Sequence, residues 1–91
     1  MYDHQFRWNE WNLEKLAKHG VSREEVEYVV CDAQPPFPRR IEDEKIMVWG
    51  QTWAGRYLQV IYIYSPAEYV FVLHARPMND TEKRRLRRRR Q

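Results

Sequence analysis

The sequence predicts an α+β fold of order βααβββα: an antiparallel β-sheet meander packed by two N-terminal helices and followed by a basic C-terminal helix. Three observations carry this prediction. Apolar residues recur at helical spacing near the N-terminus, alternating or β-branched and aromatic runs fill the second half, and arginine dominates residues 80–91. Strands joined by short turns pair with one another, which favours a meander. The 91 residues make one domain, 1–91.

The N-terminal segment predicts a short strand and a first helix. Residues 6–8 alternate between apolar and polar types, as a strand does. Asn9 is a good N-cap, and Leu13 and Leu16 lie at the spacing of one helical stripe. Gly20 supplies the left-handed residue with which many helices end.

A second helix is expected to begin directly after this turn. Ser22 is followed three residues later by Glu25, which is the capping-box pattern. Residues 34–38 are rich in proline, which lacks the backbone donor that a helix needs, so they are expected to form a surface linker. The buried side of the second helix is predicted to consist of Val26, Val29 and Val30.

Three strands follow in the prediction, at residues 45–53, 56–64 and 69–76. Residues 54–55 and 65–68 are rich in turn formers and connect them. The last two strands are apolar on both alternating sides, so we expect them to be covered on both faces, or covered on one face and aromatic on the other.

Positive charge is concentrated after the sheet. Pro77 is expected to end the last strand, and Asp80 to cap a helix that runs to Arg90. Residues 80–91 hold seven basic and two acidic side chains, a net charge of +5, whereas residues 1–79 carry −2. This basic C-terminal helix or tail favours nucleic acid or an acidic protein as a partner. A solvated C-terminus is the alternative interpretation.

Several classes of protein are disfavoured by the composition. Cys31 is the only cysteine, whereas a small secreted domain usually carries several. Residues 1–5 lack a signal-peptide pattern, and the longest nearly apolar stretch, 60–64, is too short to span a bilayer. A cytoplasmic protein without membrane association is therefore expected. The histidines and the cysteine lack metal-ligand spacing, and neither a metal nor another cofactor is predicted.

An ordered series of short motifs runs through the chain: Trp8, Lys18-His19-Gly20-Val21-Ser22, Glu44 before Ile46-Met47-Val48-Trp49-Gly50, Gly55-Arg56-Tyr57-Leu58, His74-Ala75-Arg76-Pro77-Met78 and Glu82-Lys83-Arg84-Arg85. In order and spacing this series resembles the BrnT family of type II toxins, a branch of the RelE-like proteins. The likeness extends from Phe6 to about Leu86, nearly the whole chain.

The resemblance implies a RelE-like fold and the activity of a toxin endoribonuclease that cleaves RNA without a metal, with messenger RNA as the expected substrate, and so inhibits translation. It also implies a cognate antitoxin protein as partner and, through the antitoxin complex, operator DNA. RNA brings its own nucleophile, the ribose 2′-hydroxyl. The protein must therefore supply only a base, an acid and cations that stabilise the phosphorane.

Four residues are candidates for this chemistry. Because histidine as a residue type exchanges protons near neutral pH, His19 is predicted to act as acid or base, and His74 is a further catalytic candidate. Lys18 and Arg76 are predicted to bind phosphate. His74 and Arg76 are two apart on one strand and share a face. The structural alternatives are a helix end for Lys18 and His19, a buried hydrogen-bonded position for His74, and for Arg76 an ion pair with Glu42, Asp43 or Glu44.

A second group of residues is predicted to bind RNA. Basic side chains neutralise phosphates, and aromatic rings stack on bases. Trp49, Tyr62 and Tyr64 are candidates for stacking, although at strand spacing such residues more often form the core. The predicted phosphate-binding residues are Arg56, Lys83, Arg84, Arg87 and Arg88.

Two further functions stay open. One is a non-catalytic module that binds RNA or the ribosome, and the other is a structural partner whose basic helix docks an antitoxin and DNA complex. The non-catalytic module is supported by the positions at which this chain departs from many BrnT-like sequences, namely Lys15, Lys45, Val70, Phe71 and Leu86.

Overall fold

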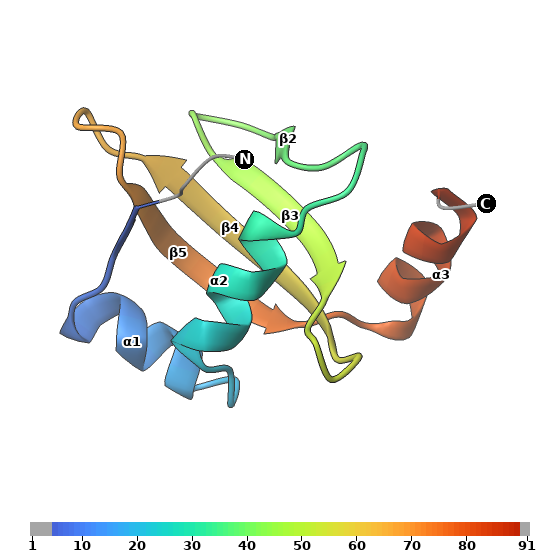
Figure 1. Cartoon of the computed structure of the whole chain (residues 1–91). Coiled ribbons are helices and arrows are strands. Elements are labelled where there is room, and N and C mark those ends of the chain that lie inside the picture. The colour runs from blue at the N-terminus through green and yellow to red at the C-terminus, as the bar shows by residue number, and fades with distance from the viewer. Residues whose placement is uncertain (1–4, 90–91) are drawn as a thin grey trace.

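The computed structural model describes residues 5–89 and shows an α+β fold, with three helices and a five-stranded mixed sheet in that part of the chain (Figure 1). Along the sheet the strand order is β1-β5-β4-β3-β2. The elements are β1 (Phe6–Arg7), α1 (Glu10–Ala17), α2 (Arg23–Cys31), β2 (Arg39–Arg40), β3 (Ile46–Gln51), β4 (Tyr57–Tyr64), β5 (Val70–Pro77) and α3 (Asp80–Arg89).

The three long strands form the antiparallel meander that the sequence predicts. In one row of the sheet Val48 lies opposite Val60, which lies opposite Ala75, and all three are buried. This side of the sheet is the one that α2 covers, because a Cβ added to Gly50 would lie 3.2 Å from Cγ1 of Val29. The main core therefore lies between the sheet and the N-terminal helices (Figure 1).

The sheet departs from the prediction at both of its edges. β1 pairs with β5 in parallel, with Phe6 opposite Val70, so the sheet is mixed and not a purely antiparallel meander. The meander of β3, β4 and β5 leaves the outer edge of β5 unpaired, and β1 occupies part of that edge. At the other edge β2 was not predicted; it is only two residues long and pairs with β3 after the proline-rich linker.

A β-bulge interrupts the pairing of β4 with β5. Tyr62 lies opposite Val72, and Ile61 lies opposite His74, so Leu73 is an extra residue on β5. A bulge of this kind shifts the alternation of side chains by one position. Val72 and Ala75 therefore both face the main core, whereas His74 lies on the other face of the sheet.

The predicted helix caps are confirmed for α1 and α2. Asn9 caps α1, and Ser22 and Glu25 form the capping box of α2. Gly20 has a positive φ of 63°, as a left-handed helix end requires. The prediction for α3 is wrong in its cap, because Asn79 accepts from the backbone N–H of Glu82 and α3 begins at Asp80. The predicted end at Arg90 lies outside the described residues.

The core predicted for α2 is confirmed, since Val26, Val29 and Val30 are buried. In α1 Leu16 is buried as expected, but Leu13 is exposed. Asn12 is fully buried instead, and its side-chain amide donates to the carbonyl oxygen of Arg7 at 2.9 Å. A polar residue can occupy this position because its hydrogen bonds are satisfied.

The proline-rich linker is closer to the core than predicted. Phe37 is buried, and its ring lies 5.7 Å from that of Trp49. The rest of residues 34–38 is exposed. This segment therefore covers part of the sheet face opposite to α2.

Candidate functional site

The candidate site forms where the end of α1 meets β5. The rings of His19 and His74, 55 positions apart in the sequence, lie in an edge-to-face arrangement with their centroids 5.5 Å apart and an interplanar angle of 71°. His19 is exposed and His74 is half-buried. Two imidazoles in contact are a suitable pair for proton transfer, since one can accept a proton while the other donates one.

The bulge at Leu73 places the second histidine. Because His74 and Arg76 lie opposite Ile61 and Gln59, both are on the face of the sheet that α2 does not cover. In a regular strand without the bulge, His74 would face the core together with Val72. The spacing of His74 and Arg76 gives these two residues a shared face, as predicted, and the bulge determines which face it is.

Arg76 is held by a carboxylate from the C-terminal helix. Its two terminal nitrogens donate to the two carboxylate oxygens of Glu82 at 2.8 and 2.7 Å, and one also donates to the carbonyl oxygen of Pro77 at 3.0 Å. The ion-pair partners predicted for Arg76 were wrong, and Glu44 instead pairs with Arg40 at 3.6 Å. The three predicted partners lie in the loop before β3, whereas Glu82 lies on α3, only six positions after Arg76.

Three groups at this site have pKa values that differ from their ordinary values. Burial, followed by the positive charge of Arg76 and the nearby His19, lowers the pKa of His74 below its ordinary value of 6.5. His74 is therefore neutral at pH 7 and suited to accept a proton. The hydrogen bonds between Arg76 and Glu82 raise the pKa of the arginine and lower that of the glutamate, so this pair is charged at neutral pH.

Arg56 and Lys18 lie near the histidine pair in different ways. Arg56 donates to the carbonyl oxygens of His19 and Gly20, at 3.3 and 2.8 Å, and pairs with Glu25 at 3.2 Å. It thereby ties the β3–β4 hairpin to the turn that carries His19. Lys18 is the exposed C-cap residue of α1. Within residues 5–89, its ammonium forms no hydrogen bond with His74.

The basic helix presents two different sets of cations. Leu86 is buried, and Lys83 and Arg87 lie over the ring of Tyr57, at 5.8 and 5.6 Å from its centroid. Arg84 is exposed and donates to the hydroxyl of Thr81. A shallow hollow of about 310 Å³ is lined by the outward-facing Arg85, Arg88 and Arg89.

Two of the three aromatic candidates for base stacking belong to the core. Tyr62 is fully buried, and Trp49 is almost so, with its indole N–H donating to Oε1 of Gln59 at 2.9 Å. Tyr64 is exposed, and its ring contacts that of Tyr62 at right angles. Tyr64 alone of these three therefore has a ring that a base can reach.

The sequence contains a signal for one site residue that the prediction missed. Glu82 follows Asn79 by three positions, which is the capping-box spacing, and its carboxylate indeed accepts from the backbone N–H of Asn79 at 2.9 Å. Recognising that box would have placed Glu82 at the start of α3, within reach of the end of β5.

Within the described residues, no group of three or more histidine, cysteine, aspartate or glutamate side chains is placed to hold a metal ion. None of the described helices has the length and apolar character needed to cross a membrane. Comparisons of the chain with protein-family models, with curated proteins and with solved structures find no match.

Proposed function

We propose that this protein is a metal-independent endoribonuclease, acting as a RelE-like toxin of the BrnT type. The observation that carries the proposal is the contact between His19 and His74, beside the cationic Arg76. A neutral imidazole, a second imidazole and a guanidinium are together the groups that RNA transesterification requires.

In the proposed reaction, neutral His74 takes the proton from a ribose 2′-hydroxyl. The 2′-oxygen attacks the adjacent phosphorus, and the bond from phosphorus to the 5′-oxygen breaks. His19 acts as the acid and gives a proton to that leaving oxygen, so the products are a 2′,3′-cyclic phosphate and a 5′-hydroxyl. Arg76 stabilises the phosphorane; its bonds to Glu82 and Pro77 engage three of its five N–H groups.

Lys18 and the outer side of α3 have the supporting role of binding the phosphates that flank the scissile bond. Messenger RNA is the proposed substrate, and inhibition of translation is the proposed result. The proposed partner is a cognate antitoxin that covers Arg76 and α3, since hiding phosphate-binding residues is the simplest way to inhibit such an enzyme. Through that complex the protein would also reach operator DNA.

The test is cleavage of an end-labelled RNA by the purified chain in EDTA, with and without ribosomes. We expect a product ending in a 2′,3′-cyclic phosphate. We expect His19→Ala and His74→Ala each to lower the cleavage rate by about 100-fold or more. Arg39→Ala is the matched control, because Arg39 is exposed and lies on β2, the edge strand at the far side of the sheet from β5 and His74. Equal rates in all four proteins would defeat the proposal.

A second function is favoured by the pairing of Arg76 with Glu82. An arginine that donates two short hydrogen bonds to a carboxylate also serves as a structural link, here between β5 and α3. In a non-catalytic module that binds RNA or the ribosome, this structural role would be the whole role of Arg76. This module predicts retained RNA affinity without cleavage. The same RNA therefore distinguishes the two functions when binding and product formation are measured together.

A further inference from the structure

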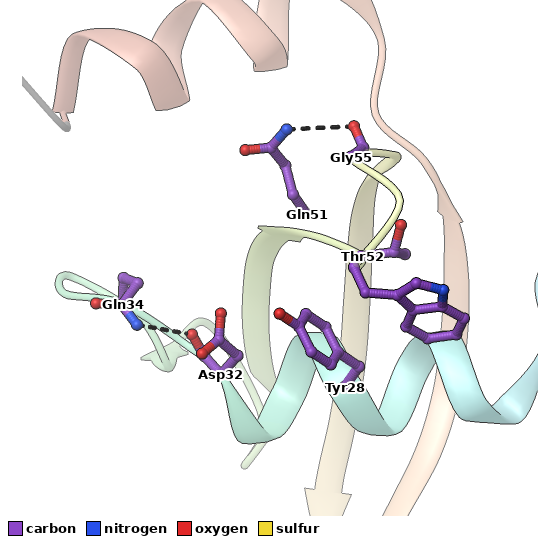
Figure 2. A pocket seen from close by; sticks show the side chains of 7 residues that line it. Tyr28, Asp32, Gln34, Gln51, Thr52 and Gly55 are labelled. Atoms are coloured by element: carbon purple, nitrogen blue, oxygen red, sulfur yellow. Dashed lines mark hydrogen bonds between the residues drawn. The ribbon is translucent and has the colours of Figure 1, made fainter.

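A pocket of about 410 Å³ lies between the tip of the β3–β4 hairpin and the end of α2. The hairpin contributes Gln51, Thr52 and Trp53, and the segment around the end of α2 contributes Tyr28, Asp32 and Gln34. Figure 2 shows Tyr28 and Asp32 on the last turns of α2, facing the hairpin. None of these residues belongs to the histidine site.

Two exposed aromatic rings form one wall of this pocket. The indole of Trp53 and the phenol ring of Tyr28 lie nearly perpendicular, at 80°, with centroids 5.7 Å apart. Trp53 is 61% exposed and Tyr28 is 41% exposed, although aromatic side chains of this size usually bury most of their surface. Aromatic rings left in solvent beside a hollow are typical of a binding surface. Their π faces attract cations as well as flat apolar groups.

The end of α2 gives this pocket a negative potential. Asp32 is the C-cap of α2, and the last turn of that helix contains no basic residue. The unpaired carbonyls of a helix C-terminus carry about half a negative charge, which an aspartate there increases instead of neutralising. Among the described ion pairs none includes Asp32. The negative charge of Asp32 at this position therefore destabilises α2 and favours the binding of a cation next to it.

We propose that this pocket binds a guanidinium group, namely an arginine side chain presented by another protein chain. A guanidinium is planar, so it stacks on an aromatic ring while it donates two parallel hydrogen bonds to a carboxylate. Trp53 and Tyr28 supply the rings, and Asp32 supplies the carboxylate. Gln34 also lines the pocket, and because its amide nitrogen donates to the carbonyl oxygen of Asp32, its side-chain oxygen is a further acceptor.

A nucleobase is the competing ligand, since bases also stack on aromatic rings. The charge of the pocket disfavours it. No lysine or arginine is among the residues that line the pocket, and the one charged group there is a carboxylate, which repels the phosphates attached to a base. The proposal concerns a different surface from the RNA cleavage site and does not depend on RNA cleavage.

The experiment titrates the full chain with the peptide acetyl-Gly-Arg-Gly-amide, followed through the indole N–H signal of Trp53 in ¹H–¹⁵N NMR spectra. The same peptide with citrulline in place of arginine is the matched control, because citrulline has nearly the same shape without the charge. We expect saturable shifts with arginine and at least about fivefold weaker binding with citrulline. Trp53→Phe identifies the signal.

Two variants test the assigned contacts. Asp32→Asn is expected to weaken arginine binding by about fivefold, the upper range for a solvent-exposed ion pair. Trp53→Ala, followed through other amide signals of the pocket, is expected to weaken it by about threefold. Asp32→Asn should not lower the melting temperature, because it removes a like charge from a helix end, so a loss of binding would not reflect unfolding.

Three outcomes would overturn the proposal: no shift with the arginine peptide, equal binding of the arginine and citrulline peptides, or binding that Asp32→Asn leaves unchanged. Cytidine and guanosine serve as the second set of probes. If either binds more tightly than the arginine peptide, the pocket recognises a base instead.

Discussion

Arg76 and Glu82 join the last strand of the sheet to the C-terminal helix through two parallel hydrogen bonds of 2.8 and 2.7 Å. The same carboxylate accepts from the backbone N–H of Asn79 and so completes the cap of α3. One glutamate thus fixes where the helix begins and orients the guanidinium beside His74. The position of α3 relative to the sheet (Figure 1) depends on this side chain and on the burial of Leu86.

Replacing Glu82 is therefore expected to cost more stability than replacing an exposed glutamate. Glu82→Gln removes the charge from the pair and weakens the cap, with an expected loss of about 1–3 kcal/mol in the free energy of unfolding. Urea denaturation followed by circular dichroism measures it. Glu24→Gln is the control, since Glu24 is exposed and pairs only with its neighbour Arg23. Similar values for the two variants would show that the Arg76 pair is energetically neutral.

Stability is also expected to depend on the protonation of His74. Its pKa in the folded chain lies below the ordinary value of 6.5, so the unfolded chain takes up a proton first as the pH falls. The contribution of the neutral imidazole is fully present above pH 6.5 and is lost as the pH falls through the folded pKa. Denaturation of the parent chain and of His74→Gln at pH 7.5 and pH 5 should show a smaller loss in the variant. An identical loss would assign the pH dependence to other groups.

Local parts of this fold could be predicted because short-range patterns specify them. Asn9 was predicted as the N-cap of α1 from its residue type, although its reciprocal bonds with Asn12 were not. Ser22 and Glu25 are three positions apart, so the signal of their capping box lies within one helical turn. The meander followed from turn residues between alternating segments. The strand ends were placed within about two residues, which is the usual precision of such patterns.

Other parts depend on long-range pairing, which leaves no local signal. The parallel pairing of β1 with β5 brings together residues more than 60 positions apart, and the bulge at Leu73 depends on the register with β4. The spacing of His74 and Arg76 predicted a common face, but nothing in the sequence placed His19 against that face. The role of Arg56 was equally hidden, because two of its acceptors are backbone carbonyls, which any residue type supplies, and its carboxylate partner Glu25 is 31 positions away.

Arg56 is expected to act as a positioning residue for His19. Arg56→Gln removes the charged bridge from the hairpin to the turn that carries this histidine. If His19 donates a proton in RNA cleavage, a small displacement of the turn should lower kcat by about tenfold and leave KM little changed. Single-turnover and steady-state cleavage measure this split. Partial rescue by Arg56→Lys is not expected, because an ammonium cannot reach the same set of acceptors. A change in KM alone would instead indicate direct RNA contact by Arg56.

The outer side of α3 is expected to determine the salt dependence of RNA binding. Changing Arg85, Arg88 and Arg89 together to glutamine removes three exposed cations that line one hollow. For single-stranded RNA each phosphate contact contributes a slope of about −0.7 in log K against log salt, so the triple variant should lower the slope by about 2. Fluorescence anisotropy of a labelled RNA at several salt concentrations measures it. The paired control changes Arg39 and Arg40 of the edge strand β2, which are exposed and lie on a different element. If this control changes the slope as much as the α3 variant does, RNA binding is spread over the whole basic surface and α3 has no special part in it.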